Sequence, residues 1–257
     1  MMLITEHLNI ALQGQSILKH IDLMIEPGAI VSILGPNGAG KSTLMKSLSG
    51  DIPDGLHQVT LEGRKLKEYS VPELAKYRAV MPQSVQLDFP FLVSEVIEMS
   101  LLTAVSHYER AAYVERALAM FDVSHLKDRN YLTLSGGEQQ RVQLARVIAQ
   151  ITHKADDRNR YLFLDECTSS LDLAHQHQVF EVVTEVVKTH RIAAIMVLHD
   201  LNLASQYSGR LVLMNQGEIV SQGTVDEVLQ EERITDVYGY PVKVTPHPKG
   251  WPMVIPA

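Results

Sequence analysis

The stretch AIVSILGPNGAGKSTLMKSLSG, residues 29–50, decides the fold. It opens with an apolar run typical of a buried strand and closes with apolar residues at helical spacing. Between them, GPNGAGKST at residues 35–43 contains the complete G-x-x-x-x-G-K-[ST] template. A strand, a glycine-rich loop and a helix in this order predict a loop that binds phosphate groups, with a ligand-free glycine turn as the alternative.

Residues 35–43 offer several kinds of group to a phosphate chain. The glycines let backbone N–H groups point inward, and the start of the helix adds a partial positive charge. We expect Lys41 to reach the β- and γ-phosphates, Ser42 to bind Mg²⁺ and Thr43 to assist at the α-phosphate. The candidate nucleotide-binding residues of this loop are Gly35, Pro36, Asn37, Gly38, Ala39, Gly40, Lys41, Ser42 and Thr43.

A second apolar stretch, YLFLDE at residues 161–166, ends in two carboxylates. Charges at the C-terminal edge of a parallel sheet face the crevice where ligands bind. We expect Asp165 to hold Mg²⁺ through its water shell and Glu166 to orient the water that attacks the γ-phosphate. Two solvated turn carboxylates are the alternative, which the nearby phosphate loop disfavours.

Three further polar residues end or follow apolar stretches: Gln83 after YRAVMP, Asp172 in SSLD and His199 after AAIMVL. Each is a candidate for the same crevice, where a glutamine binds Mg²⁺ or the attacking water and a histidine hydrogen-bonds the γ-phosphate. A structural role is the alternative for each residue taken singly. LSGGEQQR, residues 134–141, opens an amphipathic helix whose bare N-terminus is a second candidate anion site.

Composition and charge narrow the class of protein. The chain has 257 residues, 46% hydrophobic and 21% charged, which suits one compact globular unit. No apolar run reaches the roughly 18–20 residues that span a bilayer, and the start MMLITEHLNIAL shows no export signal. The net charge of −7 argues against a general nucleic-acid binder, since such proteins usually present a basic surface.

The periodicity along the chain predicts an α/β fold with a mainly parallel core sheet. LITEHLNIAL, ILKHIDLMI and HQVTLEGRKL indicate an N-terminal antiparallel β subdomain, and the helical patterns from about Val93 to Ile151 indicate an inserted helical subdomain. We place the P-loop NTPase core at residues 1–86 and 156–257 and the helical subdomain at 87–155. Five prolines in PVKVTPHPKGWPMVIPA predict an extended surface tail.

In order and identity, the motifs GPNGAGKST, Gln83, LSGGE, YLFLDE, SSLD and His199 resemble those of the ATP-binding-cassette (ABC) family, over nearly the whole chain. The resemblance implies ATP and Mg²⁺ as cofactors, with Asp172 among the nucleotide-site residues. It also implies that Ser135, Gly136 and Gly137 complete the ATP site of a second copy, so that two chains sandwich two ATP molecules head to tail. ATP binding would close this dimer and hydrolysis would reopen it.

Within the family, TSSLDLAHQHQVFEVV and the TPHP tail look most like importers of iron-siderophores, heme and vitamin B12, with heme importers most similar. This implies an ATPase on the cytoplasmic face of a bacterial inner membrane. Its partners would be a permease dimer, docked just after Gln83, and indirectly a periplasmic substrate-binding protein, with no nucleic acid. Siderophore and B12 import stay open, because the cargo would touch other subunits.

Two other classes of protein share the phosphate loop. A soluble ABC ATPase acting on nucleic acid generally carries coiled coils, zinc modules or a second cassette, and this chain has one cassette, one cysteine and an acidic charge. A small-molecule P-loop kinase would explain GPNGAGKST but not LSGGE or His199.

Some residues depart from the family pattern or suggest other sites. Cys167 stands where relatives commonly have proline, either packing in the turn or acting as a redox switch. Leu12 takes the place of the usual adenine-stacking aromatic. His175 and His177 suggest a metal site, but residues two apart on a helix point to different sides. The polar run THKADDRNR, residues 152–160, predicts a surface loop.

Overall fold

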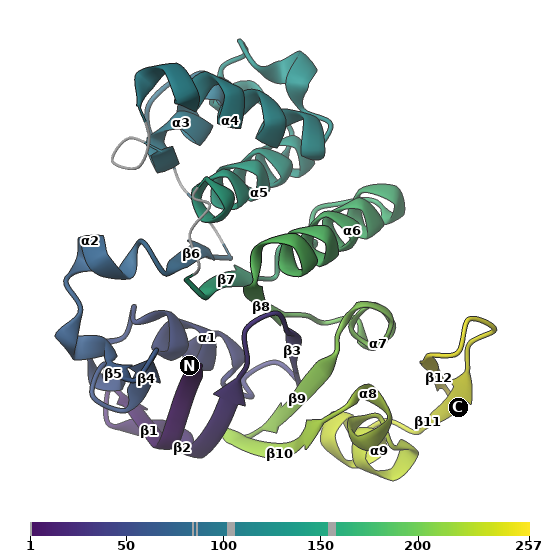
Figure 1. Ribbon diagram of the computed structural model, residues 1–257. Helices are drawn as coiled ribbons and strands as arrows, with labels where there is room; N and C mark the ends of the chain where they lie inside the picture. The colour runs from purple at the N-terminus through teal and green to yellow at the C-terminus, as the bar shows by residue number, and fades with distance from the viewer. Residues whose placement is uncertain (1, 84, 86, 102–105, 154–157) are drawn as a thin grey trace.

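The computed structural model describes residues 2–83, 85, 87–101, 106–153 and 158–257. Its core is a six-stranded sheet in the order β10-β9-β3-β8-β7-β6, seen in Figure 1. The strands are β3 (Ile30–Leu34), β6 (Arg78–Met81), β7 (Arg160–Asp165), β8 (Ile192–Val197), β9 (Arg210–Asn215) and β10 (Glu218–Gly223). All neighbours pair in parallel except β10, which is antiparallel to β9. The predicted mainly parallel sheet is therefore confirmed.

The central strands are apolar along their whole length because both faces of the sheet are covered. Every residue of β7 and β8 is buried. Tyr161 and Phe163 join the hydrophobic cluster on one face, whereas Leu162 and Leu164 join the cluster on the other. Successive side chains of a strand point to opposite faces, so a continuous apolar run is what this position requires.

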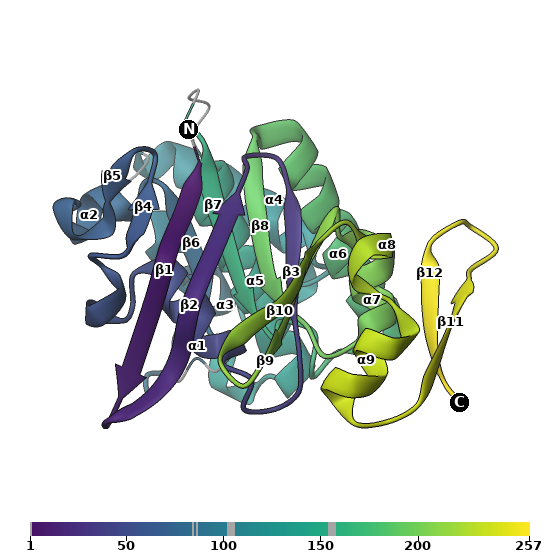
Figure 2. The ribbon, with the colours of Figure 1, turned by 90° about the horizontal axis from the view of Figure 1, so that it is seen from below.

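A second, four-stranded sheet has the order β2-β1-β4-β5 and is antiparallel throughout. Its strands are β1 (Leu3–Leu12), β2 (Gln15–Ile25), β4 (Val59–Leu61) and β5 (Arg64–Lys65), with β1 and β2 side by side in Figure 2. Leu8 and Ile21 of this sheet share one hydrophobic cluster with Ile33 and Phe163 of the core sheet. The N-terminal antiparallel sheet predicted from the alternating pattern is confirmed.

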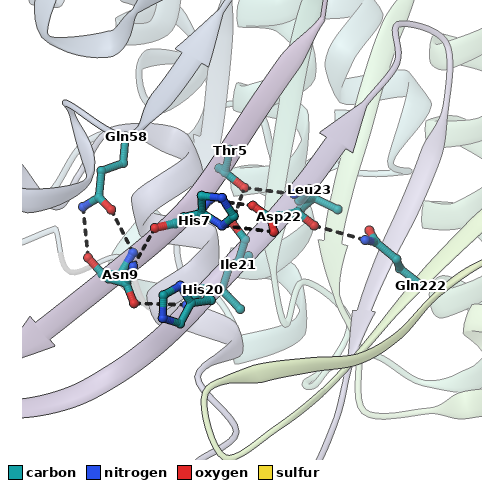
Figure 3. Close-up of polar contacts among 9 residues, drawn as sticks. All are labelled: Thr5, His7, Asn9, His20, Ile21, Asp22, Leu23, Gln58 and Gln222. Carbon is teal, nitrogen blue, oxygen red and sulfur yellow. Dashed lines mark hydrogen bonds and ion pairs between the residues drawn. The ribbon is translucent and has the colours of Figure 1, made fainter.

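The pairing of β1 with β2 is irregular, and polar side chains stabilise the irregular positions (Figure 3). His7 and His20 have positive φ angles of 52° and 49°. Asp22 Oδ1 accepts a hydrogen bond from His7 N at 2.5 Å, and Asn9 Oδ1 accepts one from His20 N at 3.1 Å. Gln222 Nε2 donates to the Asp22 carbonyl at 3.1 Å and so links β10 of the core sheet to β2.

Helices cover the core sheet, and three of them lie together at one end of the molecule. The helices are α1 (Lys41–Ser49), α2 (Val71–Leu74), α3 (Val93–Glu98), α4 (His107–Met120), α5 (Gly136–Thr152), α6 (Leu173–His190), α7 (Leu201–Tyr207), α8 (Val225–Val228) and α9 (Glu231–Tyr238). Single 3-10 turns lie at Pro53–Gly55, Leu66–Glu68, Met99–Leu101, Ser124–Leu126 and Tyr131–Thr133. Helices α3, α4 and α5 contact one another and lie together at the top of Figure 1. The exact boundaries of a helical subdomain stay a prediction.

The C-terminal tail is extended, as predicted, but forms a hairpin that the sequence did not predict. Strands β11 (Val242–Pro246) and β12 (Pro252–Pro256) pair with each other, and the rings of His247 and Trp251 stack 4.0 Å apart. Asn202 of α7 anchors the hairpin by accepting from Val254 N at 2.7 Å and donating to Val254 O at 3.1 Å.

The predicted surface loop at residues 152–160 is only partly described, because residues 154–157 lie outside the described residues. At its end the prediction is wrong. Arg160 begins β7, is 3% exposed and donates from Nη1 to the Ile151 carbonyl at 2.9 Å. Within the described part of the chain, no helix combines the length and apolarity needed to cross a membrane.

Candidate nucleotide site

The phosphate loop joins the end of β3 to the start of α1. Gly35 and Gly40 have φ angles of 143° and 97°, which side chains rarely allow. A Cβ atom on Gly35 would lie 2.2 Å from the carbonyl oxygen of Met214. The backbone path of this loop therefore requires glycine at its first position.

Lys41 lies inside the loop with 6% of its surface exposed. Its Nζ donates to the carbonyl of Gly35 at 2.8 Å and to that of Pro36 at 3.0 Å. Burial lowers the pKa of Lys41, and the nearby carboxylates of Glu166 and Asp165 partly oppose that shift. An ammonium group that has lost water and faces loop carbonyls is suited to bind an incoming anion.

A cavity of about 320 Å³ opens over this loop. Its lining residues are Ile17, Asn37, Gly38, Ala39, Gly40, Lys41, Ser42, Thr43 and Glu166. The structure therefore brings the predicted loop residues from Asn37 to Thr43 around one cavity with Glu166, whereas the predicted Gly35 and Pro36 do not line it.

The two carboxylates at the end of β7 have different surroundings. Asp165 is 3% exposed, and its Oδ1 accepts a hydrogen bond from Ser42 Oγ at 3.4 Å. Burial raises the pKa of Asp165, the Ser42 hydrogen bond lowers it, and the charge of Glu166 raises it further. Two of the three residues predicted to hold Mg²⁺, Ser42 and Asp165, are thus neighbours, although they are 123 positions apart.

Two polar side chains donate hydrogen bonds to the carboxylate of Glu166, and we call these three residues the glutamate clasp (Gln83, Glu166 and His199). Gln83 Nε2 donates to Glu166 Oε2 at 2.8 Å, and His199 Nε2 donates to Glu166 Oε1 at 2.6 Å. Gln83 follows β6 and His199 follows β8, the two strands that flank β7. The structure thus joins these three predicted residues by hydrogen bonds.

Other predicted site residues lie away from the loop cavity. Ser135 caps α5 by accepting from Glu138 N at 3.3 Å, and Ser135 N donates to Glu138 Oε2 at 2.7 Å. Gly136 is exposed and Gly137 half-buried at the start of that helix. Asp172 caps α6, with Oδ1 accepting from His175 N at 2.9 Å, and bonds from this residue lower the pKa of Asp172. None of these four predicted residues lines the loop cavity of its own chain.

The structure shows the burial and contacts of the residues that depart from the family pattern or suggested other sites. Cys167 is fully buried, and burial raises the pKa of its thiol to about 12, so it packs in the turn and is unsuited to redox chemistry. Leu12 is 40% exposed, whereas Ile17 lines the loop cavity. His177 Nδ1 shares a hydrogen bond with Tyr207 Oη at 2.7 Å. In the described ranges no group of three metal-binding side chains occurs.

Besides Ile17, two other side chains that touch this site were not predicted. Tyr238 Oη accepts a hydrogen bond from Gly35 N at 3.1 Å, and Gln140 Nε2 donates to the carbonyl of Glu166 at 3.2 Å. Gln140 stands within the LSGGEQQR motif. The only feature of the sequence that could have pointed to it is that it is an uncharged polar residue near the start of a helix. Tyr238 carries no signal, because it is 203 positions from its partner.

Comparison with known proteins identifies the family. A family model described as ABC transporter matches residues 18–169. The chain belongs to the ABC transporter family. The hemin import ATP-binding protein HmuV of Hydrogenovibrio crunogenus is 52% identical to this ABC chain over 100% of both. A protein of the same name from Vibrio vulnificus (strain CMCP6) is 42% identical over 98% of this chain and 96% of its own.

Solved ABC structures agree with the fold. A metal-chelate-type ABC transporter in an inward-facing conformation superposes with a TM-score of 0.79 at 22% identity, covering 100% of this chain and 97% of the other. The cbiO1 protein of Clostridium perfringens, part of the ABC transporter complex cbiONQ, gives 0.74 at 27% identity, covering 91% and 92%. This chain is therefore an ATP-binding ABC domain.

Proposed function

We propose that this chain is the ATP-hydrolysing subunit of a bacterial ABC importer that takes up heme. The observation that carries the proposal is the glutamate clasp, which holds a carboxylate at the cavity of the phosphate loop. Relatives named hemin import ATP-binding proteins, 52% and 42% identical, support heme as the cargo.

The residues of the loop cavity fit a nucleotide with Mg²⁺. The buried ammonium of Lys41 regains a charged partner when phosphate oxygens replace the loop carbonyls. Ser42 and Asp165 offer a hydroxyl and a carboxylate, the oxygen ligands that Mg²⁺ prefers, and Gln83 adds an amide oxygen nearby. The Mg²⁺–ATP complex supplies the phosphoryl group and neutralises part of its charge.

Glu166 is the residue that we assign to water activation. Its carboxylate orients and polarises a water molecule, and a carboxylate fixed at both oxygens loses little freedom in doing so. His199 donates from Nε2 and, with Gln83, keeps the carboxylate aimed at the cavity. Gln83 and His199 are both exposed, so each can give up its hydrogen bond to Glu166 and bond the γ-phosphate when the nucleotide is present.

The second half of each site comes from another copy of the chain. Ser135 and Gly136 are exposed at a helix N-terminus that carries partial positive charge, yet neither lines the loop cavity of its own chain. Asp172 is likewise exposed at the start of α6. A head-to-tail pair with twofold symmetry gives these residues a nucleotide to contact and produces two equal sites.

The membrane partners belong to the same proposal. A permease dimer docks on the helical subdomain, residues 87–155, just after Gln83, where Phe89 and Leu132 are 67% and 46% exposed. Exposed large apolar side chains are typical of a protein interface. The chain then lies on the cytoplasmic face of the inner membrane, and a periplasmic substrate-binding protein delivers the cargo from the other side.

Hydrolysis is tested with Glu166→Gln and Lys41→Ala. Glu166→Gln keeps the size of the side chain but removes the base, so we expect ATP binding within about twofold of wild type and turnover reduced by about a hundredfold or more. Lys41→Ala is expected to lose binding, because it removes the buried cation. Equilibrium nucleotide binding and phosphate release separate the two effects. Wild-type turnover in Glu166→Gln would refute the assignment.

The cargo is tested in cells that lack the gene for this chain and must take iron from heme. A wild-type copy should restore growth on heme, whereas the Lys41→Ala copy should not. Growth on a ferric siderophore is the control. If the deletion abolishes siderophore use and leaves heme use intact, the heme assignment is wrong while the ATPase assignment stands.

A further inference from the structure

The turn after β7, residues 166–171, is held by glutamine side chains from two different helices. Gln176 of α6 donates from Nε2 to the carbonyl of Thr168 at 3.2 Å and to that of Leu171 at 3.0 Å. Gln140 of α5 reaches the same turn from the other side. The backbone that follows Asp165 is therefore fixed by α5 and α6 together.

Gln140 uses both ends of its amide on this turn. Its Nε2 donates to the carbonyl of Glu166 at 3.2 Å, and its Oε1 accepts from Ser170 N at 3.1 Å. The side chain is half-buried between these groups. Because the donor and the acceptor are both engaged, the amide has one orientation that satisfies the turn.

Glu166 has a backbone conformation that needs such support. Its φ angle is +51°, in the left-handed region that residues with a side chain rarely adopt. Its N–H donates to the Val197 carbonyl at 3.2 Å, which ties it to β8. Its own carbonyl accepts from Ser169 N only at 3.4 Å, so Gln140 provides the shorter hydrogen bond on that side. Gln140 therefore sets the direction in which the chain leaves Glu166.

Helix α5 carries Gln140 at a fixed distance from the helix start. Ser135 caps the helix, and Gln140 follows after little more than one turn. The helix start also lies against the same turn, since a Cβ atom on Gly137 would be 3.0 Å from the Ser170 carbonyl. Because one helix carries both residues, a shift of Ser135 would also move Gln140, which donates to the carbonyl of Glu166.

We infer that Gln140 is a positioning residue for ATP hydrolysis, which ties the backbone of Glu166 to the helix that begins at Ser135. The inference rests on the proposed function, in which that helix start contacts the nucleotide of the second copy. Gln140 then makes the aim of Glu166 in one site depend on how the helix start is seated at the other site. Gln83 and His199 hold the carboxylate of Glu166, and Gln140 holds its main chain.

The test compares Gln140→Ala with Gln150→Ala in the full chain. Gln150 is a matched control, because it lies half-buried on the same helix and its Nε2 donates to a backbone carbonyl, that of Arg78, at 3.3 Å. For Gln140→Ala we expect kcat to fall about tenfold or more, with KM for ATP and equilibrium ATP binding within about twofold of wild type. Gln150→Ala should keep the wild-type kcat.

A second variant identifies which hydrogen bond matters. Gln140→Glu keeps an acceptor for Ser170 N but loses the donor to the Glu166 carbonyl, so it should be as slow as Gln140→Ala. Wild-type kcat in Gln140→Ala, or equal losses in Gln150→Ala, would overturn the inference. A fall in ATP binding that matches the fall in kcat would also overturn it, because it would indicate a general structural role.

The failure of this inference is distinguishable from failure of the proposed function. If wild type hydrolyses ATP, Glu166→Gln does not, and Gln140→Ala equals wild type, only the role of Gln140 is wrong. If wild type does not hydrolyse ATP, both the proposed function and the role of Gln140 are wrong. If Glu166→Gln remains active, the chain is still an ATPase, but the roles assigned to Glu166 and Gln140 are both wrong.

Discussion

Gly35 shows how a single residue of the phosphate loop depends on a distant part of the chain. It is buried, no side chain fits beside Met214, and its N–H donates to the hydroxyl of Tyr238 at 3.1 Å. Burial raises the pKa of Tyr238 to about 12, so the phenol stays protonated over the physiological range. The last residue of α9 therefore satisfies the first N–H of the loop.

Replacing Tyr238 by phenylalanine should destabilise the chain through this one atom. The buried N–H of Gly35 would lose its acceptor, which costs about 1–3 kcal/mol of unfolding free energy. Tyr240→Phe is the control, because Tyr240 is 56% exposed. Urea unfolding of both variants gives the comparison. Equal stability of Tyr238→Phe and wild type would show that the hydrogen bond contributes nothing.

Cys167 should be unreactive in the folded chain. Burial raises the pKa of its thiol from 9.0 in the unfolded chain to about 12, and the thiolate is the reactive form. As pH rises from 9 towards 12, the unfolded chain releases this proton before the folded one does, so Cys167 lowers folding stability across that window. Iodoacetamide should label Cys167 only in the unfolded chain, so the labelled fraction should rise with the unfolded fraction as denaturant is added. Rapid labelling of the native chain would contradict the burial.

The three residues of the glutamate clasp were predictable one by one. The side chains that contact the backbone of Glu166 and of the phosphate loop were not. Gln83, Glu166 and His199 each follow an apolar stretch, and the C-terminal ends of parallel strands meet at one edge of a sheet. Gln140 and Tyr238 reach their partners across 26 and 203 positions with no spacing rule. Contacts between a side chain and a distant backbone atom depend on packing that local patterns do not encode.

At the scale of elements, periodicity predicted the sheets and helices, whereas pairing of the tail was missed. Strands β7 and β8 are wholly buried, and their continuous apolar runs indicated that directly. In the tail, five prolines remove backbone donors and suggested only an extended chain. The hairpin tolerates them because Pro246 pairs with Pro252, and Pro256 lies opposite Val242, at its two ends.

The same hairpin should loosen when its anchor on α7 is removed. Asn202→Ala deletes one bond to Val254 N and one to Val254 O, each worth about 1 kcal/mol. Amide hydrogen exchange in β11 and β12 should then accelerate by about tenfold or more. Lys243→Ala is the control, because its ion pair with Glu231 lies on the exposed surface and contributes little. Unchanged exchange in Asn202→Ala would place the anchor elsewhere.

At the scale of the whole molecule, the proposed site is divided between two parts of one chain. The loop cavity collects residues 37–43 with Glu166, while Ser135 and Gly136 are exposed and line no part of it. Residue patterns predicted two anion-binding helix ends, but they did not predict that only one of them lines the loop cavity. That expectation came from the family resemblance, because an interface between copies leaves no periodic signal in a sequence.

This division predicts that ATP stabilises the chain in a way that depends on protein concentration. A ligand that binds only the folded state raises unfolding free energy by RT ln(1 + [L]/Kd), about 2.7 kcal/mol at a hundredfold excess over Kd. If each Mg²⁺–ATP contacts two chains, diluting the protein at constant ATP must lower the midpoint of thermal unfolding as well. Glu166→Gln is the chain to measure, because slow turnover preserves the nucleotide.

Two controls separate the composite site from simple binding. Lys41→Ala should show no midpoint shift with ATP, because the buried cation of the loop is gone. In Glu166→Gln, Ser135→Arg should leave the shift at low protein concentration and remove its rise at high concentration, since the bulky cation obstructs only the exposed helix start. A midpoint that responds to ATP but never to protein concentration would mean that each chain binds its nucleotide alone, and the twofold arrangement would then be excluded under those conditions.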